Sequence, residues 1–411
     1  MISLLRRNRD IRVVFGAQVV SFLGDWFTFV ALAGLVEDVT GSPFLVSLVL
    51  VSMTIPGLFM SPIAGSFADR FDRRKILIVV SIIQACASLL LLLHSVVGIW
   101  VVFFALSIIA AFAAFVGPAT SAAIPNLTDN EDDLRRASAL FGSTWGIMLA
   151  VGAALGGVFA RVFGRDAAFI ANAVSFVIAA LLFASVRRPM QSERTKNAST
   201  RRVRPLADMK EAINIAKKDK IILALLCSKM TFAVGAGIVS QLAVLASTAF
   251  NTGDAGRGLL IGVRGIGSGL GPIIGARIVG RDMAKLLKVC GFAGLIFATC
   301  YLAAAFSPFI GMAAVFIALA HLSGGAQWTL STLGLQIESP DEIRGRVIAG
   351  DMALVNTMIG VTSILAGLAS EAIGVRYAIM VFSIAAAIAS VIYLIATAGI
   401  RERLRNESLQ Q

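Results

Sequence analysis

Five ionisable side chains stand inside long apolar stretches of this 411-residue sequence: Asp25, Lys229, Arg264, His321 and Asp351. A charge at membrane depth is costly, so such residues mark ion pathways, proton relays or buried ion pairs by default. A carboxylate or an imidazole can take up a proton there, and a lysine or arginine can pair with an acid. The sequence offers no clustered nucleophile and base and no metal-ligand spacing, so we expect no enzyme, no metal and no cofactor.

The apolar stretches that hold these residues predict membrane-spanning helices. The chain is 57% hydrophobic and 15% charged, with a mean hydropathy of +0.85. About 20 apolar residues span a bilayer, and lipid cannot satisfy the backbone of any open structure, so these spans must be helices. We therefore expect an all-α integral membrane protein with twelve transmembrane helices, near 12–36, 43–64, 76–97, 99–122, 135–160, 167–186, 220–247, 256–279, 284–305, 308–334, 343–369 and 375–398.

The positive charge of the chain gathers on one side of these spans. The net charge is +12, and most of the 36 lysines and arginines fall in the loops that an even number of spans places together with both termini. Since positive residues stay in the cytoplasm, both termini are expected there, in a multi-pass protein of a bacterial inner (plasma) membrane. This topology explains the basic composition without a nucleic acid partner.

Two halves of the sequence resemble each other. Pro62 and Gly65 in "SPIAGSFADR" correspond to Pro272 and Gly275 in "GPIIGARIVG", and "DDLRRAS" corresponds to "DEIRGRV" at nearly the same offset. Such repeats are one known transporter plan. The predicted domains are a six-helix bundle over 1–186, a basic cytoplasmic linker over 187–219 with an amphipathic helix near 205–218, a second six-helix bundle over 220–400, and a tail over 401–411.

The loop "GSFADRFDRRK" resembles the signature G-x-x-x-D-R-x-G-R-R-[KR] of the major facilitator superfamily, between helices two and three. Its matching residues are Gly65, Asp69, Arg70, Arg73, Arg74 and Lys75. Asp72 stands where the family has glycine. The resemblance implies a cytoplasmic latch, in which the acid of helix two holds the start of helix eleven, with Arg73 pairing with Asp69. Ordinary surface ion pairs are the alternative.

Helix five carries a nearly bare face of glycines. "GAALGG" resembles the antiporter motif G-P-x-x-G-G of the superfamily, with Gly152, Gly156 and Gly157 matching and Ala153 in place of proline. In the family this motif marks exporters. The alternative is tight helix packing, which small residues favour in lipid. The start "FGAQVVSFLGDWFTFVAL" and the "RGRV" at 344–347 are similar to the bacterial efflux branch that includes macrolide exporters and the enterobactin exporter.

The resemblance also places helices one and seven at a central cavity. Asp25 and Lys229 lie ~18 and ~14 Å into these helices, so we expect an ion pair between them that a proton or the substrate releases. The alternative is that Lys229 extends to the cytoplasm and Asp25 joins a local network. His321 is either a proton relay or a buried structural histidine, and Arg264 and Asp351 are either structural partners or part of the pathway. Six further side chains are expected at the cavity: Gln18, Trp26, Trp145, Gln241, Gln327 and Trp328.

Together these features favour a secondary transporter that exports amphipathic or apolar small molecules, drug-, macrolide- or siderophore-like, by alternating access and proton antiport. It is expected to be a monomer in contact with membrane lipid. A lysophospholipid transporter or flippase on the same fold is the alternative, and a receptor that kept the fold without transport is a third.

Overall fold

The computed structural model describes residues 2–191, 219–280, 282–339 and 341–409, and the side chains of some helical residues within these ranges lie outside the description. Twelve helices in the described ranges are long and apolar enough to cross a membrane, as the sequence predicts. The chain divides into two compact units, residues 1–40 with 51–203 and residues 41–50 with 204–411. The predicted helix at 205–218 lies outside the described residues.

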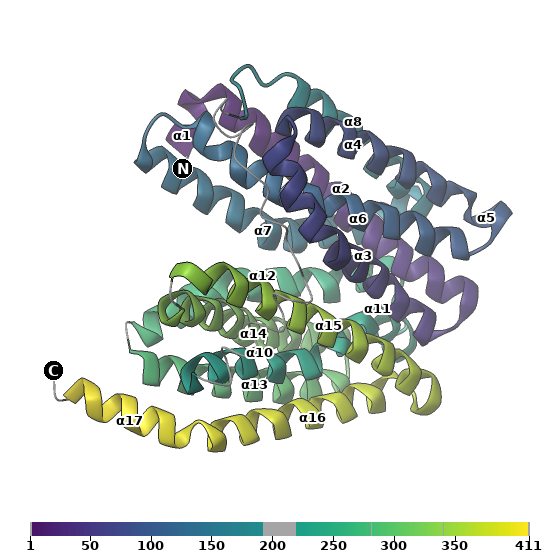
Figure 1. Ribbon diagram of the computed structural model, residues 1–411. Helices are drawn as coiled ribbons and strands as arrows, with labels where there is room; N and C mark the ends of the chain where they lie inside the picture. Colours follow the sequence, from purple (N-terminus) through teal and green to yellow (C-terminus); the bar gives the residue numbers. More distant parts are fainter. Residues whose placement is uncertain (1, 192–218, 281, 340, 410–411) are drawn as a thin grey trace. The chain divides into compact units, whose positions relative to one another are not determined.

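The first unit contains the helices of the N-terminal half (Figure 1). They are α1 (Ile2–Arg7), α2 (Arg9–Thr40), most of α3 (Pro43–Arg70), α4 (Arg73–Leu90), α5 (His94–Val97), α6 (Trp100–Leu127), α7 (Glu131–Phe163) and α8 (Arg165–Ala184), with a 3₁₀ turn η1 (Leu91–Leu93). Gly152 and Gly156 of α7 lie against Trp26 and Phe27 of α2, where an added Cβ would come within 2.8 Å of either residue. The bare glycine face therefore packs α7 closely against α2.

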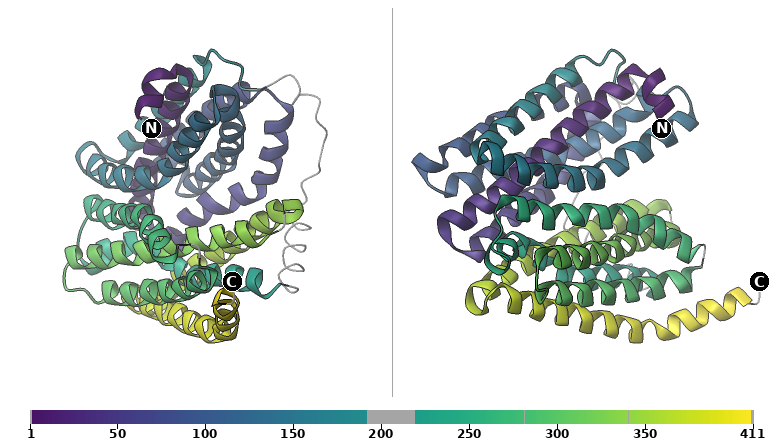
Figure 2. Two further views of the ribbon diagram at one scale, coloured as in Figure 1. Left: turned by 90° about the vertical axis from the view of Figure 1, so that its left-hand side faces the viewer. Right: turned by 180° about the vertical axis from the view of Figure 1, so that it is seen from behind.

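The second unit contains the helices of the C-terminal half. They are α10 (Lys220–Ala236), η3 (Gly237–Gln241), α11 (Leu242–Val244), η4 (Leu245–Ala249), α12 (Asp254–Val279), α13 (Met283–Ala305), α14 (Ile310–Glu338), α15 (Asp341–Ile373), α16 (Val375–Ala396) and α17 (Ala398–Leu409). The predicted tail is thus largely helical, and α17 continues the line of α16 (Figure 2). The predicted seventh span is α10 followed by 3₁₀, α and π turns. A Cβ at Gly237 would collide with the Thr362 backbone, so α15 approaches the chain there too closely for any larger residue.

The two halves repeat each other at an offset of 210 positions. Asp72 accepts hydrogen bonds from the backbone of Arg74 and Lys75 as the N-cap of α4, and Asp282 caps α13 in the same way. The turns before α8 and α16 both use a glycine with positive φ, Gly164 at 87° and Gly374 at 84°. These equivalences support the predicted duplication. They also explain why Asp72 replaces the glycine of the family signature, because aspartate is a strong helix cap.

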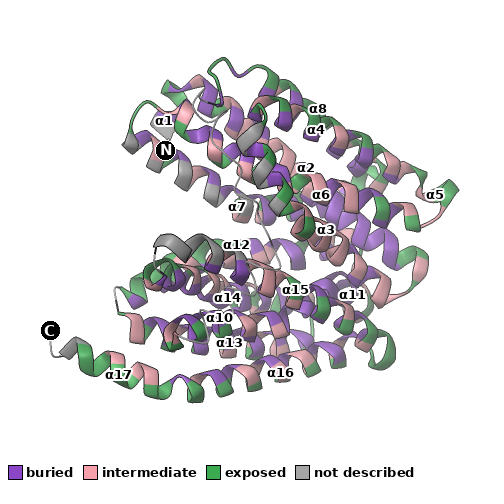
Figure 3. Cartoon of the chain, viewed as in Figure 1, coloured by how far each residue is buried: buried purple, intermediate pink, exposed green. Residues whose placement is uncertain are grey.

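The outward faces of the helices are apolar. Figure 3 shows exposed and buried residues alternating along the helices of each unit. On α8 the exposed large side chains recur at helical spacing: Ile170, Val174, Val177, Ile178 and Leu181. An apolar stripe of this kind suits lipid contact rather than water.

Two boundaries differ from the expected domains. Residues 41–50 group with the second unit: Ser42 hydrogen-bonds Glu371, and Gly367 lies against Phe44 and Ser47. Residues 187–190, expected in the linker, are bound to the N-terminal helices, because Asp10 accepts hydrogen bonds from the backbone N–H groups of Arg187 and Arg188. The tertiary contacts of these short segments decide which unit holds them.

Candidate functional site

A buried ion pair joins α10 to α15 within the second unit. The Lys229 ammonium binds the Asp351 carboxylate, and both side chains are completely shielded from solvent. Lys229 Nζ also donates to Thr332 Oγ1 of α14 at 2.8 Å and lies 5.0 Å from the centre of the Trp328 ring. Three helices therefore meet at one ammonium group, which is satisfied by an anion, a hydroxyl and an aromatic face.

The carboxylate of this pair is less well satisfied than the ammonium. Asp351 Oδ2 accepts from Lys229, whereas Oδ1 has no hydrogen-bond partner among the described residues. An ionised oxygen that is buried without a donor is costly. Asp351 is thus held by a single described charge partner, and a proton added to its carboxylate would remove the counter-charge of Lys229.

Gln327 precedes Trp328 on α14 and fixes this helix against α10. Its Nε2 donates to the Ser228 carbonyl at 2.6 Å and to Thr231 Oγ1 at 2.9 Å, and its side chain is fully buried. Gln241 is also buried and donates to the Pro43 carbonyl at 3.4 Å. Both amides were expected at a cavity, yet here they bind backbone and hydroxyl groups within the second unit.

The partner of Lys229 corrects the expected pairing with Asp25. Lysine is long enough to reach several helices, and two acids, Asp25 and Asp351, stand inside apolar stretches of the sequence, so spacing alone does not choose between them. Asp25 belongs to the first unit, on α2, near the Asn172 amide of α8. Asn172 Nδ2 has no hydrogen-bond partner among the described residues. Asp25 is a partly buried acid beside Asn172, in line with the local network of the alternative. The other part of that alternative, in which Lys229 extends to the cytoplasm, is wrong, because Lys229 is completely buried and paired with Asp351.

The remaining candidates in the first unit lie on the faces that pack α2 against its neighbours. Gln18 Nε2 approaches the Phe141 carbonyl of α7 at 3.5 Å. Trp26 is 9% exposed and contacts Phe29 edge-on, 5.6 Å between ring centres. Gly157, like Gly152 and Gly156, is buried on α7.

A second polar cluster connects α12, α13 and α14. Arg264 Nε donates to His321 Nε2 at 3.2 Å, and the Tyr301 hydroxyl lies 2.8 Å from the same nitrogen. His321 and Tyr301 are buried, and Arg264 is partly exposed. Sequence reasoning singled out Arg264 and His321 separately and missed both Tyr301 and Thr332. Tyr301 is one of three tyrosines in the chain, and that rarity within an apolar helix is the signal that could have found it.

The basic loop between α3 and α4 binds backbone carbonyls. Arg73 is 4% exposed and donates to the carbonyls of Ala68, Ala122 and Met190 at 2.7–3.1 Å. Arg74 donates to the Arg188 carbonyl at 2.9 Å. These two arginines tie the segment after α8 to the end of the first unit. The side chains of Asp69 and Arg70, and Gly65, lie outside the described residues, so the latch stays a prediction.

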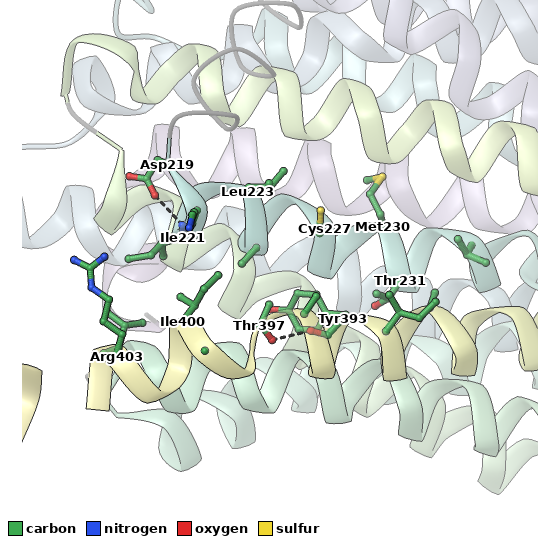
Figure 4. A pocket seen from close by; sticks show the side chains of 18 of the residues that line it. Asp219, Ile221, Leu223, Cys227, Met230, Thr231, Tyr393, Thr397, Ile400 and Arg403 are labelled. Carbon is green, nitrogen blue, oxygen red and sulfur yellow. Dashed lines mark hydrogen bonds between the residues drawn. The ribbon is translucent and has the colours of Figure 1, made fainter. Parts of the chain in front are cut away.

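A pocket of about 1170 Å³ lies between α10, α16 and α17. Its wall includes Leu223, Cys227 and Ile400 on the apolar side and Asp219 and Arg403 at one end (Figure 4). None of the predicted site residues lines it. The described residues contain no group of three or more histidine, cysteine or acidic side chains that could hold a metal ion.

The profile of the family described as Transmembrane secretion effector matches residues 5–409, nearly the whole chain. The chain belongs to this family of the major facilitator superfamily. Members of this superfamily are transporters, and the chain is an efflux-type secondary transporter of small molecules rather than an enzyme. The resemblance of the 65–75 loop and the prediction of a multi-pass membrane protein are thereby confirmed.

Several curated relatives are named as exporters or transporters. A protein of Bacillus amyloliquefaciens named as an exporter of bacilysin, BacE, is 24% identical and covers 90% of this chain and 91% of its own length. The staphyloferrin A transporter of Staphylococcus aureus is 23% identical, and the match covers 88% of this chain and 89% of the relative. Macrolide efflux protein A of Streptococcus pyogenes is 26% identical over 52% of each chain. The chain thus spans about half the length of some relatives it matches and about nine-tenths of others.

Solved structures of transporters share the fold. A bacterial homologue of the human lysosomal transporter Spinster, in an inward-facing conformation, has a TM-score of 0.75 at 16% identity and covers 95% of this chain and 96% of its own. The nucleoside transporter NupG has a TM-score of 0.69 at 14% identity, and the match covers 93% of this chain and 98% of NupG. At these identities the likeness concerns the fold alone.

Proposed function

We propose that this protein exports amphipathic or apolar small molecules by alternating access, and that each export step is coupled to proton entry through the Lys229–Asp351 pair. The observation that carries the proposal is the complete burial of this pair between α10 and α15. The names of its relatives, which include a bacilysin exporter, a macrolide efflux protein and a staphyloferrin A transporter, support the export of small molecules. In this proposal the protein lies in the plasma membrane as a monomer with both termini in the cytoplasm, an orientation that the positive loops support.

The charge balance of the pair explains how proton binding would be coupled to helix movement. With Asp351 ionised, Lys229 is neutralised and α10, α14 and α15 are held together. When a proton binds Asp351, the buried ammonium loses its only described carboxylate partner and must become hydrated, move or release its own proton. Each of these outcomes loosens the junction of the three helices, so proton binding and helix rearrangement are linked.

The loop at 65–75 supplies the second part of the cycle in this proposal. In this proposal Asp69, the acid of the signature, forms the latch, because the partial positive charge of a helix N-terminus favours an acid. Arg73 fixes the base of the loop through its three carbonyl contacts. The latch closes the cytoplasmic end in one state and opens it in the other.

The test is proton movement in proteoliposomes on addition of macrolides, siderophores, dyes and lysophospholipids. We expect one compound class to drive proton flux in the wild type. The double variant Lys229→Gln with Asp351→Asn removes both charges and keeps hydrogen-bonding groups, so it should fold and move substrate without protons. Asp166→Asn, an exposed acid that pairs with His94, is the matched control and should behave like the wild type.

Three outcomes contradict this proposal. If substrate moves without proton flux in the wild type, the protein is not an antiporter. If the double variant still couples substrate to protons, another residue carries the coupling. If lysophospholipids alone are moved, the protein is a lipid transporter.

A further inference from the structure

Arg264 lacks a carboxylate partner in the described part of the chain. It lies ten residues after the start of α12, which places it ~15 Å along the helix. Its described hydrogen bond runs from Nε to His321, and no ion pair involves it in the residues that the structure describes. An unpaired cation at this depth is expensive, and charges at such positions face an interior or a water-filled path.

His321 and Tyr301 hold this arginine from one side. Because Arg264 Nε donates to His321 Nε2, that nitrogen must offer its lone pair, and the imidazole is neutral with its proton on Nδ1. The Tyr301 hydroxyl lies beside the same nitrogen, and Phe297 packs edge-on against the imidazole at 5.8 Å. These contacts fix the imidazole ring of His321. The hydrogen bond from Arg264 to this ring then fixes the orientation of the guanidinium plane.

The backbone beneath Arg264 is also fixed. Gly267 and Gly271, three and seven residues further along α12, lie against the backbone of α14 at Ala318 and Leu322, so closely that a Cβ on either would collide with a carbonyl oxygen. Helices that touch through glycine cannot slide past side chains without losing this contact. Arg264 and His321 consequently stay in one register.

The two terminal nitrogens of the Arg264 guanidinium remain available to a ligand. Neither Nη atom has a hydrogen-bond partner among the described residues, and the side chain is partly exposed. The two Nη groups form a planar fork that matches the two oxygens of a carboxylate. We propose that Arg264 binds a carboxylate of the exported substrate, and that the exported compounds include amphipathic acids. This inference rests on the proposed export of amphipathic small molecules and names their chemical class.

The experiment compares two probes that differ only in charge, N-dansyl-phenylalanine and its carboxamide, with the full-length protein in nanodiscs. Binding is followed by dansyl fluorescence. We expect the wild type to bind the acid roughly tenfold or more tightly than the carboxamide, as for charge-assisted bidentate pairs. Arg264→Met should weaken binding of the acid to the level of the carboxamide and leave the carboxamide unchanged, which also shows that the variant is folded. Arg264→Lys keeps the charge without the fork and should retain part of the preference.

Arg277→Met is the matched control, because Arg277 is exposed at the end of the same helix. It should keep the full preference for the acid. Equal binding of both probes by the wild type, or a preference that survives Arg264→Met, would overturn the inference. A transport assay of both probes in proteoliposomes distinguishes a failure of the carboxylate site from a failure of the proposed function. If the wild type moves both without preference, only the carboxylate site is wrong. If it moves neither these probes nor any compound of the panel above, the proposed function is wrong and the carboxylate site is wrong with it.

Discussion

Lys229 and Arg264 are two basic residues inside the same helical unit, and their surroundings are opposite. Lys229 is completely buried and neutralised by Asp351. Arg264 is partly exposed, and the groups that orient it, His321 and Tyr301, are neutral. The Lys229 site has no net charge and holds three helices together. The Arg264 site carries a net positive charge and can accept an anion. The role of a basic residue inside the membrane thus depends on the groups around it rather than on whether it is lysine or arginine.

The largest expected effect comes from breaking the Lys229 site. Asp351→Ala leaves Lys229 buried without its counter-charge, and breaking one partner of a buried pair costs about 3–5 kcal/mol. We expect a marked fall of the melting temperature of the purified protein in detergent. Replacing both partners by apolar residues, Lys229→Met with Asp351→Leu, should recover most of the stability, since well-packed apolar replacements of such pairs are often neutral. A single variant as stable as the wild type would show that the pair does not hold the helices.

A smaller effect is expected from Gly271→Ala. The added Cβ would meet the Leu322 carbonyl and the Ala326 backbone nitrogen, so α12 must move away from α14 at a cost of about 1–3 kcal/mol. This shift separates Arg264 from His321 and should weaken binding of the acidic probe. Gly269→Ala is the matched control, because nothing lies within 4 Å of the added atom, and it should leave both stability and binding unimpaired. Identical behaviour of the two variants would mean that the glycine contact does not set the Arg264 site.

The smallest effect is expected from Tyr301→Phe, which removes the hydroxyl beside His321 Nε2. Loss of one hydrogen bond costs about 1 kcal/mol, and the looser imidazole should lower the affinity for the acidic probe a few-fold while the affinity for the carboxamide stays the same. Tyr393→Phe is a useful comparison, because the Tyr393 hydroxyl is buried without a hydrogen-bond partner among the described residues. Its removal should be neutral or slightly stabilising. If both variants weaken acid binding alike, Tyr301 does not position Arg264 through His321.

The sequence by itself determined the elements of this protein. Long apolar runs can only be helices in a membrane, so the twelve spans were predicted, and the loop at 65–75 identified the superfamily. Turn and cap residues such as Asp72 and Gly164 also act over a few neighbouring positions, but their roles became evident only in the structure.

Only the tertiary structure decided which charges meet. Lys229 was expected to pair with Asp25 and instead pairs with Asp351, 122 positions away in the chain. Arg264, Tyr301 and His321 come from three different helices. Helical periodicity tells which face of a helix a residue occupies, but the partner across that face depends on how closely the backbones approach, and here glycines such as Gly271 and Gly237 set that distance.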